Sequence, residues 1–357
     1  MSVVAFAPHM RGMETLEAVR ALATVETVTS LAEIENADFI AVAKVRGWNL
    51  VVKKDEVALG DAVVYFEIDS HLPLSDPRFA FLAPRGSKIV NGVDGHVLTT
   101  ARMRGVYSQG LAMPATLFPE LETLADGEDL ATVLGVTKYE KPIPAEIAGK
   151  VSGEFPTRFA PKTGAERVQN LTDVFTELRA AYDWIATEKV DGESTTFIND
   201  GGVLRVAGRE WEFAAPDSPS EATVPWKIAA EYNILDRLPE GHTVQGELYG
   251  AGVLAKNTLK EAGKKFLAFN VLRDGVFVPR SEWPAAIEEI GTPVLDLELP
   301  ATVEEALAQV EGMKSVLNPA VMAEGIVWHN TVGARIPELQ GRTGMKAINN
   351  KWLVKHS

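Results

Sequence analysis

A segment rich in proline and glycine near the middle of the sequence most limits how this chain can fold. Between residues 138 and 163 it contains four prolines, from Pro142 to Pro161. Proline fixes the backbone and glycine loosens it, so such a segment is typical of a connection between domains. With 357 residues the chain is long enough for two hydrophobic cores. We therefore expect two folded units joined by a linker over residues 138–163, with the boundary near Lys150.

The first half of the sequence has the pattern of a small β-domain. From residue 21 to about residue 114, short apolar or alternating stretches such as FIAVAKV and AVVYFEI are separated by polar turns that contain glycine. This spacing favours strands over helices. We expect residues 21–137 to form a five-stranded barrel of the OB type, whose open face commonly receives nucleic acid. A β-domain without a ligand is the alternative, because a fold does not fix a function. Residues 1–20 are expected to be an N-terminal extension.

The second half, residues 164–357, mixes strand-like and helical stretches. ATEKV, TVQGELYG and KFLAFNVL resemble strands, whereas WKIAAEYNILDRL, PAAIEEI and VEEALAQVEGM resemble helices. This alternation predicts an α+β domain of mostly antiparallel sheets flanked by helices. A helix is expected over Leu171–Ala181, with Thr172 as its cap.

Composition excludes several classes of site. The chain has no cysteine, so disulfides, zinc-thiolate sites and cysteine nucleophiles are excluded, and a metal must be held by oxygen or imidazole. Magnesium suits such ligands. No apolar run is long enough to cross a bilayer, and the first residues lack the layout of a secretory signal, so a soluble, cytoplasmic protein without membrane contact is expected.

The charge of the chain is unevenly distributed. A formal net charge of -14 argues against nonspecific coating of nucleic acid. Positive charge nevertheless gathers in two zones, which allow an acidic protein to hold a polyanion locally. The first zone contains Arg85, Lys88, Arg102 and Arg104, and the second contains Arg335, Arg342, Lys346, Lys351 and Lys355.

The strongest candidate for chemistry is the sequence Lys-Val-Asp-Gly at residues 189–192, between two strand-like segments. A lysine amine is a nucleophile only when it is deprotonated, so burial or nearby positive charge must favour its neutral form. Gly192 would let the backbone approach a nucleotide closely. The tetrapeptide alone is a weak signal, because about one chain in ten of this length contains it by chance. A solvated turn is the alternative interpretation.

The motifs that follow residues 189–192 strengthen the signal. In order along the chain they are an arginine in GRE (208–210), a Gly-Glu in QGELYG (245–250), the aromatic stretch FLAFNV (266–271), a Glu-Gly in EGIV (324–327) and a lysine in MKAI (345–348). This order resembles the covalent lysine nucleotidyltransferases, which include RNA ligases, DNA ligases and mRNA capping enzymes. The segments TKYEKP, GEFP, FAPKTGAERVQNL and RGVYSQGL further resemble the ATP-dependent RNA ligases that carry an N-terminal OB domain.

The resemblance implies a fold and an activity. The second domain would be a nucleotidyltransferase domain of the ATP-grasp-like ligase and capping-enzyme type. The enzyme would form a covalent lysyl-AMP, transfer the AMP to a 5'-phosphate end and join that end to a 3'-hydroxyl, with ATP and Mg²⁺, or Mn²⁺, as cofactors. Lys189 would be the nucleophile, and Lys346 would hold the α-phosphate as a cationic clamp. Asp191, Glu247 and Glu324 would hold the metal, the two glutamates being counted as catalytic together with the two lysines.

The resemblance also implies a nucleotide pocket. Arg167 and Arg209 would bind ribose or phosphate oxygens, because the arginine fork suits two acceptors. Phe269 would stack on adenine, with Phe266 as the second choice on the same predicted strand. The full set expected to bind the nucleotide is Arg167, Gln169, Asn170, Glu188, Asp191, Gly192, Arg209, Phe269 and Lys346.

The expected substrate is RNA, or a nicked duplex with RNA on the 3'-hydroxyl side, and a monomer is favoured. DNA ligases and capping enzymes normally continue into a C-terminal OB domain, whereas here only nine residues follow Lys346 up to and including Lys355. The alternatives are a DNA ligase, another covalent nucleotidyltransferase such as a guanylyltransferase, or a noncatalytic nucleotide- or RNA-binding protein.

One position departs from the family pattern. Related enzymes often carry a second basic residue two positions before the last lysine, where this chain has Gly344. Arg342, Lys351 or Lys355 are the candidates to supply that charge. His71, His96 and His329 are assigned no role, because a lone histidine is more often structural.

Overall fold

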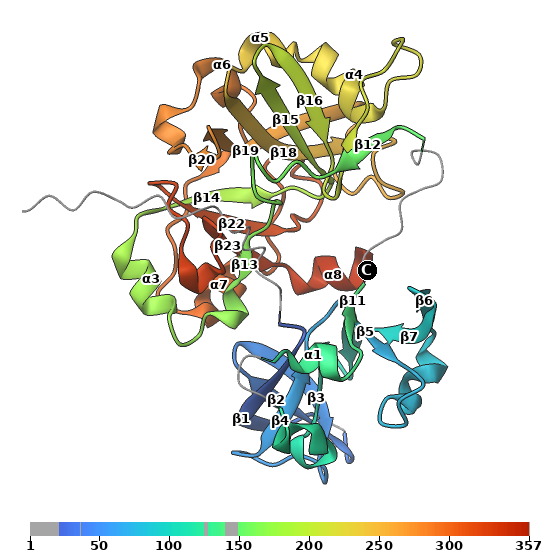
Figure 1. Ribbon diagram of the computed structural model, residues 1–357. Coiled ribbons are helices and arrows are strands. Elements are labelled where there is room, and N and C mark those ends of the chain that lie inside the picture. Colours follow the sequence, from blue (N-terminus) through green and yellow to red (C-terminus); the bar gives the residue numbers. More distant parts are fainter. Residues whose placement is uncertain (1–20, 36, 125–127, 140–148, 357) are drawn as a thin grey trace, which may run out of the picture.

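Figure 1 shows the computed structural model of the protein, which describes residues 21–35, 37–124, 128–139 and 149–356. Two sheet-rich bodies lie one above the other, the N-terminal body below and the C-terminal body above, and helix α8 (Asn350–His356) lies between them. The expected extension, residues 1–20, and residues 140–148 of the expected linker are outside the described residues.

The N-terminal body is built on a five-stranded antiparallel sheet with the strand order β10-β4-β1-β2-β3. A bulge in β1 between Val28 and Ser30 divides this strand into a half that pairs with β4 and a half that pairs with β2. The hairpin β8–β9 lies beside β3, which is one edge strand of this sheet. There the Val51 amide donates to the Ser108 hydroxyl at 3.0 Å. The strands span Ala23–Glu33 (β1), Ile40–Val45 (β2), Trp48–Lys53 (β3), Ala62–Phe66 (β4), Thr100–Met103 (β8), Val106–Gln109 (β9) and Leu111–Pro114 (β10).

The apolar alternation of the sequence decides which side chains fill this barrel. In β3, Trp48, Leu50 and Val52 are buried and share a cluster with Tyr65 of β4. The alternate side chains of β4, among them Phe66, enter a second cluster on the other face. Because both faces of β4 are buried, this strand lies at the centre of the domain. The OB-type barrel expected from the sequence is confirmed.

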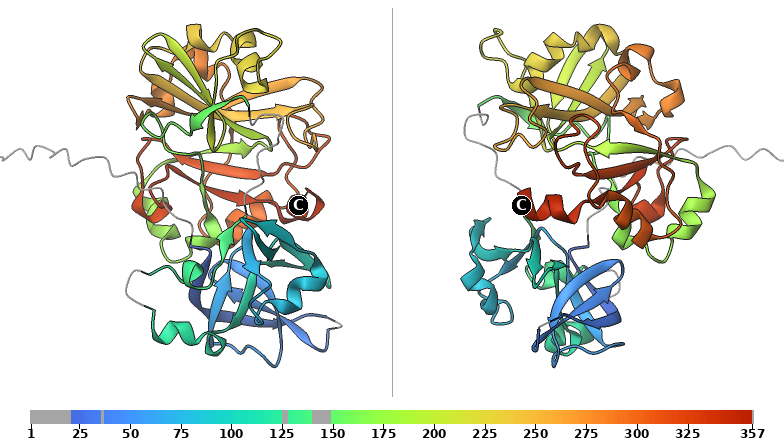
Figure 2. Two further views of the ribbon diagram at one scale, coloured as in Figure 1. Left: turned by 45° about the vertical axis from the view of Figure 1, so that its right-hand side comes forward. Right: turned by 180° about the vertical axis from the view of Figure 1, so that it is seen from behind.

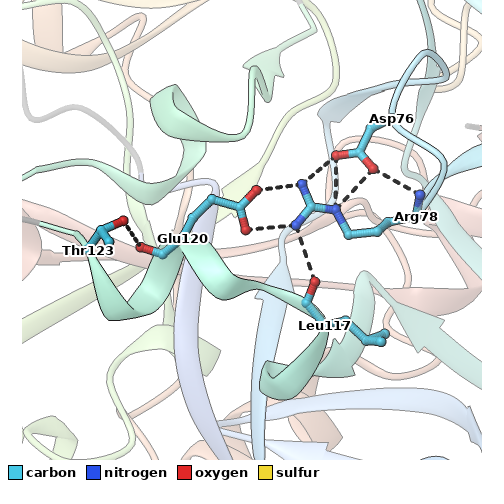
Figure 3. A network of polar contacts seen from close by, with 5 residues as sticks. All are labelled: Asp76, Arg78, Leu117, Glu120 and Thr123. Atoms are coloured by element: carbon cyan, nitrogen blue, oxygen red, sulfur yellow. Dashed lines mark hydrogen bonds and ion pairs between the residues drawn. The ribbon is translucent and has the colours of Figure 1, made fainter.

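A smaller four-stranded sheet, with the order β11-β5-β7-β6, extends from the barrel. Arg78, in the loop that follows β5, links this sheet to the turn η3, because its guanidinium donates to both Asp76 and Glu120 (Figure 3). The elements span Ser70–Pro73 (β5), Ala80–Arg85 (η1), Lys88–Val90 (β6), Val93–Val97 (β7), Ala115–Leu117 (η2), Pro119–Glu122 (η3), Leu130–Val133 (α1) and Thr137–Lys138 (β11).

The C-terminal body contains two sheets. The larger has seven strands in the order β12-β17-β16-β15-β18-β19-β20, and the smaller has five in the order β13-β23-β22-β14-β21. In the smaller sheet β13 runs parallel to β23. The strands span Val151–Glu154 (β12), Glu166–Arg167 (β13), Trp184–Lys189 (β14), Glu193–Asp200 (β15), Val203–Ala207 (β16), Trp211–Phe213 (β17), His242–Gly250 (β18), Lys264–Arg273 (β19), Val276–Phe277 (β20), Val294–Leu295 (β21), Gly325–Asn330 (β22) and Gly344–Ile348 (β23).

Helices cover one face of each sheet and leave the other face for polar side chains. The smaller sheet buries Ala186, Ile326 and Trp328 against α3 and α7, and the larger sheet buries Val244 and Leu248 against α4 and α5. Along their strands, Lys189, Lys346 and Glu247 alternate with the buried residues. Their side chains therefore lie on the face of each sheet that the helices do not cover. The helical elements span Val168–Asn170 (η4), Phe175–Ala181 (α3), Val224–Glu231 (α4), Ile234–Arg237 (α5), Arg280–Glu282 (η5), Ala285–Glu288 (α6), Val303–Val310 (α7) and Pro337–Leu339 (η6).

Three expectations about elements need correction. Helix α3 begins at Phe175 rather than Leu171, and Thr172 does not cap it, because a 3-10 turn ending at Asn170 comes first. The stretch WKIAAEYNILDRL forms two helices, since Asn233 adopts a left-handed conformation that ends the first. The expected linker includes β12, which pairs with β17 in the larger sheet. The domain boundaries themselves stay a prediction.

Candidate active site

Lys189 is the last residue of β14, directly opposite Gly325 of β22. Its Nζ atom lies 2.9 Å from both carboxylate oxygens of Glu324, the residue before Gly325. A side chain at Gly325 would place its Cβ 2.1 Å from the carbonyl oxygen of Ala347 on β23. Glycine at this position therefore lets three strands approach closely, which brings the Glu-Gly motif beside the lysine.

Three carboxylates control the charge of the Lys189 amine. Burial alone would lower the pKa of Lys189, but the negative charges of Glu324, Glu247 and Asp191 raise it above the ordinary value. About a quarter of the Lys189 side chain is exposed. In this state Lys189 is an ammonium, and positive charge from a bound partner must offset the carboxylates before it can react as a nucleophile.

Glu247 comes from the larger sheet, on β18. Burial raises the pKa of Glu247 to about 8, the Lys189 charge lowers it, and Glu324 and Asp191 raise it further. Burial likewise raises the pKa of Glu324, against the opposing effect of Lys189. Gly192 closes the gap between the two sheets, since a Cβ there would lie 2.2 Å from the Leu248 carbonyl oxygen. The Lys-Val-Asp-Gly sequence thus brings Lys189 on one sheet close to Glu247 on the other.

Asp191 is held by a residue that the sequence did not single out. The Thr258 hydroxyl donates to Asp191 Oδ2 at 2.7 Å. Thr258 lies in the loop between β18 and β19, where no motif marks it. A short polar side chain that orients a carboxylate can only be found once the loop has been placed in space.

The carboxylates fit a metal that arrives with a nucleotide better than a preassembled metal centre. Across the described parts of the chain, no three histidine, aspartate or glutamate side chains converge tightly enough to form a metal cluster. Asp191, Glu247 and Glu324 nevertheless all act on the Lys189 amine. Magnesium keeps several waters and commonly takes only one or two carboxylates beside phosphate oxygens. The donor set therefore suits a hydrated divalent cation.

Arg167 and Lys346 are brought together by the parallel pair β13 and β23, in which they are direct partners. Lys346 also acts on the Glu324 carboxylate, whose pKa it lowers. The two cationic residues therefore lie on neighbouring strands at the same face as the lysine and its carboxylates. Gly344 has no room for a basic side chain, since a Cβ there would lie 2.7 Å from the Trp328 carbonyl oxygen.

Two of the three candidates for the missing charge at Gly344 form ion pairs elsewhere. Arg342 forms an ion pair with Glu166, and Lys351 forms one with Glu311 at 3.0 Å.

His329 lies opposite Gly344 on β22, and its Nδ1 atom would be 3.5 Å from a Cβ at Gly344. Burial and the Arg280 charge lower the pKa of His329 to about 4, so this imidazole is neutral at pH 7.

The turn η4 contains Gln169 and Asn170. Gln169 is fully buried, and neither of its side-chain amide atoms has a hydrogen-bond partner among the described residues. Asn170 instead contacts the barrel, because its Oδ1 atom accepts the Trp48 indole N–H at 2.7 Å and its Nδ2 atom donates to Glu67 at 3.0 Å. Of the two, Gln169 retains the capacity to bind a ligand.

Glu188 precedes the lysine and is almost completely buried. Its Oε2 atom accepts the Val316 amide at 2.7 Å, whereas its buried Oε1 atom has no hydrogen-bond partner in the described structure. Burial raises the pKa of Glu188, while hydrogen bonds from Ser315 and Val316 lower it. A buried acceptor with spare capacity is suited to an amino group of a ligand.

The two aromatic candidates of β19 differ in environment. Phe266 is 1% exposed and packs against Phe197 in the core, at 5.0 Å between ring centroids. Phe269 is only partly buried and has no partner in the register of β18 and β19, since Gln245 pairs with Asn270 and Gly246 with Ala268. Because of this bulge, the residues of β19 that face the core are 266 and 268 before the bulge and 271 after it. Phe266 is therefore a core residue, and Phe269 is the better stacking candidate.

Arg209 lies in the tight connection between β16 and β17. More than half of its side chain is exposed, and its Nε atom lies 3.4 Å from Glu210. Its charge lowers the pKa of Glu247, which shows that the guanidinium acts on the same carboxylates as Lys189. Arg209 is thus a largely exposed cation at the edge of the site.

Comparison with known proteins follows the same division of the chain. The model of an OB-fold domain matches residues 22–115, and the model of the RNA ligase family matches residues 182–348. No curated protein matches the chain in a sequence search. Within the described residues, no helix is long and apolar enough to cross a membrane.

Solved structures extend the similarity to almost the whole chain. A variant of Naegleria gruberi RNA ligase with AMP and Mn is 34% identical, with a TM-score of 0.81, over 94% of this chain and 99% of its own. The same ligase with PPi gives 34% identity and a TM-score of 0.79, over 95% and 99%. A further variant with ATP and Mn gives 33% identity and a TM-score of 0.80, over 94% and 99%. At this identity and coverage, the chain belongs to the RNA ligase family.

Proposed function

We propose that the protein is an ATP-dependent RNA ligase in which Lys189 carries the AMP. The observation that carries this proposal is the position of the Lys189 amine, 2.9 Å from Glu324 and under the charge of Glu247 and Asp191. An amine surrounded by acidic oxygens, with two further cations on adjacent strands, is suited to attack on a phosphate of a nucleotide.

In the first step the neutral Lys189 amine attacks the α-phosphorus of ATP. A bond between nitrogen and phosphorus forms, the bond to the bridging oxygen breaks, pyrophosphate leaves, and the nitrogen loses a proton. Lys346 stabilises the charge that develops on the α-phosphate, as a cationic clamp does in phosphoryl transfer. Arg167, its partner across the two strands, and Arg209 bind ribose or phosphate oxygens.

The remaining pocket residues recognise the base and ribose. Phe269 stacks on adenine, and the free Glu188 oxygen accepts a hydrogen bond from the base. The unsatisfied Gln169 amide and the close backbone approach at Gly192 complete the pocket. Asn170 contributes to the pocket only through its neighbours, since its amide already contacts the barrel.

Asp191, Glu247 and Glu324 are the residues that would hold a divalent cation, either Mg²⁺ or Mn²⁺. When bound, the cation supplies positive charge that offsets the carboxylates and the phosphates. The residues of the chain then act as follows: Glu324 releases the amine from its ion pair, and Thr258 keeps Asp191 in place.

In the second step an oxygen of a 5'-phosphate end attacks the phosphorus of lysyl-AMP. The bond to Lys189 breaks, and the AMP is joined to the end through a pyrophosphate bond. In the third step a 3'-hydroxyl attacks the activated 5'-phosphate, a phosphodiester forms, and AMP leaves. All three steps are in-line substitutions at phosphorus, so alignment of the reacting groups dominates the rate.

A nicked duplex with RNA on the 3'-hydroxyl side is the proposed substrate, and the two basic zones of the sequence support it. The barrel and α8 meet where the Gln109 side chain donates to Asn350 at 2.9 Å. The exposed Arg102 lies on β8, a strand that contacts α8, and α8 carries Lys355. The second zone also reaches the site, since its Lys346 acts on the Glu324 carboxylate. A monomer in the cytoplasm stays a prediction.

Covalent labelling tests the nucleophile. Incubation with α-labelled ATP and magnesium, followed by denaturing electrophoresis, should label the wild-type protein, and Lys189→Ala should remove all label. Lys265→Ala, which removes an exposed lysine of β19, is the matched control and should be labelled normally. Label retained by Lys189→Ala would refute the proposal.

Sealing assays test the substrate. Matched nicked duplexes that differ only in whether ribose or deoxyribose precedes the nick should be sealed at least about tenfold faster with ribose. Equal sealing of both would favour a DNA ligase, and label from GTP instead of ATP would favour a guanylyltransferase. Nucleotide binding without any label would indicate a noncatalytic protein.

A further inference from the structure

The turn between β2 and β3 of the barrel rests directly on η4 of the catalytic body. The Gly47 amide donates to the Gln169 carbonyl oxygen at 2.9 Å. A Cβ at Gly47 would lie 2.7 Å from the Gln169 Cα atom, so two backbones touch here without a side chain between them. The barrel is therefore seated against the short segment that follows Arg167.

Trp48, the first residue of β3, contacts two residues of the segment that follows Glu166. Its indole N–H donates to Asn170 Oδ1 at 2.7 Å, and the Arg167 guanidinium carbon lies 5.5 Å from the centre of its ring. Trp48 is completely buried in the core of the barrel and packs near Tyr65, at 6.3 Å between ring centroids. The ring is thus a rigid support for the guanidinium.

The same segment is held from other directions. Asn170 Nδ2 donates to Glu67 of the barrel at 3.0 Å and to Glu166 at 2.8 Å. Glu166 also accepts the Arg167 amide at 3.0 Å. β13 has only two residues, Glu166 and Arg167, and its single strand partner is β23. The Trp48 ring therefore adds a contact from the barrel to the side chain of a residue in a very short strand.

We propose that Trp48, a core residue of the N-terminal barrel, positions Arg167 of the catalytic body for nucleotide binding. The inference rests on the proposed role of Arg167 in binding ATP. Trp48 itself does not touch the nucleotide. It acts through the face of its ring, which borders the guanidinium, and through Asn170, which ties η4 to the barrel.

A double-mutant cycle tests the inference, with the KM for ATP and the maximal rate of lysyl-AMP formation as readouts. Trp48→Phe keeps an aromatic ring but removes the indole N–H, and should raise the KM for ATP about fivefold with little change in the maximal rate. Arg167→Ala should raise it further. The double variant should resemble Arg167→Ala alone, because Trp48 then has no guanidinium to position.

Lys44→Ala is the matched control. It removes another contact between the barrel and the catalytic body, the ion pair between Lys44 and Glu304 of α7, and should leave the KM for ATP unchanged. An equal increase with Lys44→Ala would mean that any loosening of the junction has the same effect, which overturns the inference. Fully multiplicative effects of Trp48→Phe and Arg167→Ala would overturn it as well.

Thermal unfolding of each variant separates loss of positioning from loss of structure. If Trp48→Phe unfolds, Asn170→Ala replaces it in the same cycle, with the same expected result. A normal KM for ATP in Arg167→Ala would overturn both the inference and the role of Arg167. Label retained by Lys189→Ala would instead refute the proposed function, so the two failures are distinguishable.

Discussion

At the scale of single residues, the protein holds a reactive amine in an unreactive form. The carboxylates that surround Lys189 raise its pKa, whereas nucleophilic attack needs the neutral amine. The motif residues were predictable from the sequence because their types and order are characteristic. The side chains that orient them were not: Thr258 and Trp48 carry no motif, and only the fold brings them to Asp191 and Arg167.

The two phenylalanines of β19 should respond differently to truncation. Phe269→Ala should raise the KM for ATP about tenfold with little change in stability, because base stacking on an aromatic ring contributes about 1–3 kcal/mol. Phe266→Ala should lower the free energy of unfolding by about 3–5 kcal/mol, because it leaves a cavity in the core. Chemical denaturation and labelling kinetics measure both. The reverse pattern would assign stacking to Phe266.

His329 should make the stability depend on pH. Its folded-state pKa of about 4 is below the ordinary value of 6.5, so the unfolded chain binds the proton more tightly. Its contribution is complete at pH 7 and is lost as the pH falls from about 6.5 towards 4. Between pH 7 and pH 5 the loss is roughly 2 kcal/mol. His329→Gln should reduce this pH dependence in denaturant titrations, and an unchanged dependence would contradict the assignment.

At the scale of elements, the sequence predicts strands and helices well where one face is buried, and less well where the chain bends. The alternation in β2 and β3 is visible in the residues themselves, as is the capping box of α7, formed by Thr302 and Glu305. The bulge at Phe269 and the helix break at Asn233 depend on backbone conformations that neighbouring strands and helices select. They were therefore not predictable from periodicity.

The connection between β14 and β15 should tolerate no side chain at Gly192. Gly192→Ala would place a Cβ 2.2 Å from the Leu248 carbonyl oxygen and 2.9 Å from Glu247, which pushes the two sheets apart. Labelling should fall at least about 100-fold, since misplacement by about 1 Å has this effect on catalysis. Gly153→Ala, at a β12 position with open space around it, is the control and should label normally. Similar rates for both variants would show that the contact is not needed.

At the scale of the whole molecule, two regions distant in sequence cooperate. The barrel and the catalytic body meet through Gly47, Trp48 and Asn170, and the C-terminal helix meets the barrel at Gln109. The presence of two domains was predictable from composition and the proline-rich segment. Their contacts were not, because polar residues at such a junction look like ordinary surface residues in a sequence.

The barrel hairpin should contribute to nucleic-acid affinity without affecting the chemistry of ATP. The double variant Arg102→Ala/Arg104→Ala should bind nicked duplex more weakly and reduce the salt dependence of binding by about two released counterions. Lysyl-AMP formation should be unchanged. Lys227→Ala/Lys265→Ala removes the same charge from exposed positions of α4 and β19 and serves as the control in titrations at several salt concentrations. Equal losses in the two pairs would argue for a purely global charge effect.

The contact between Lys189 and Glu324 also protects the enzyme while it is idle. A free, neutral amine in an accessible pocket would combine with aldehydes and other electrophilic metabolites. Held as an ammonium by Glu324, the side chain is inert to them, and on the mechanism that we propose it becomes reactive only when the nucleotide is bound. The same acid that assembles the site thus preserves the nucleophile between turnovers.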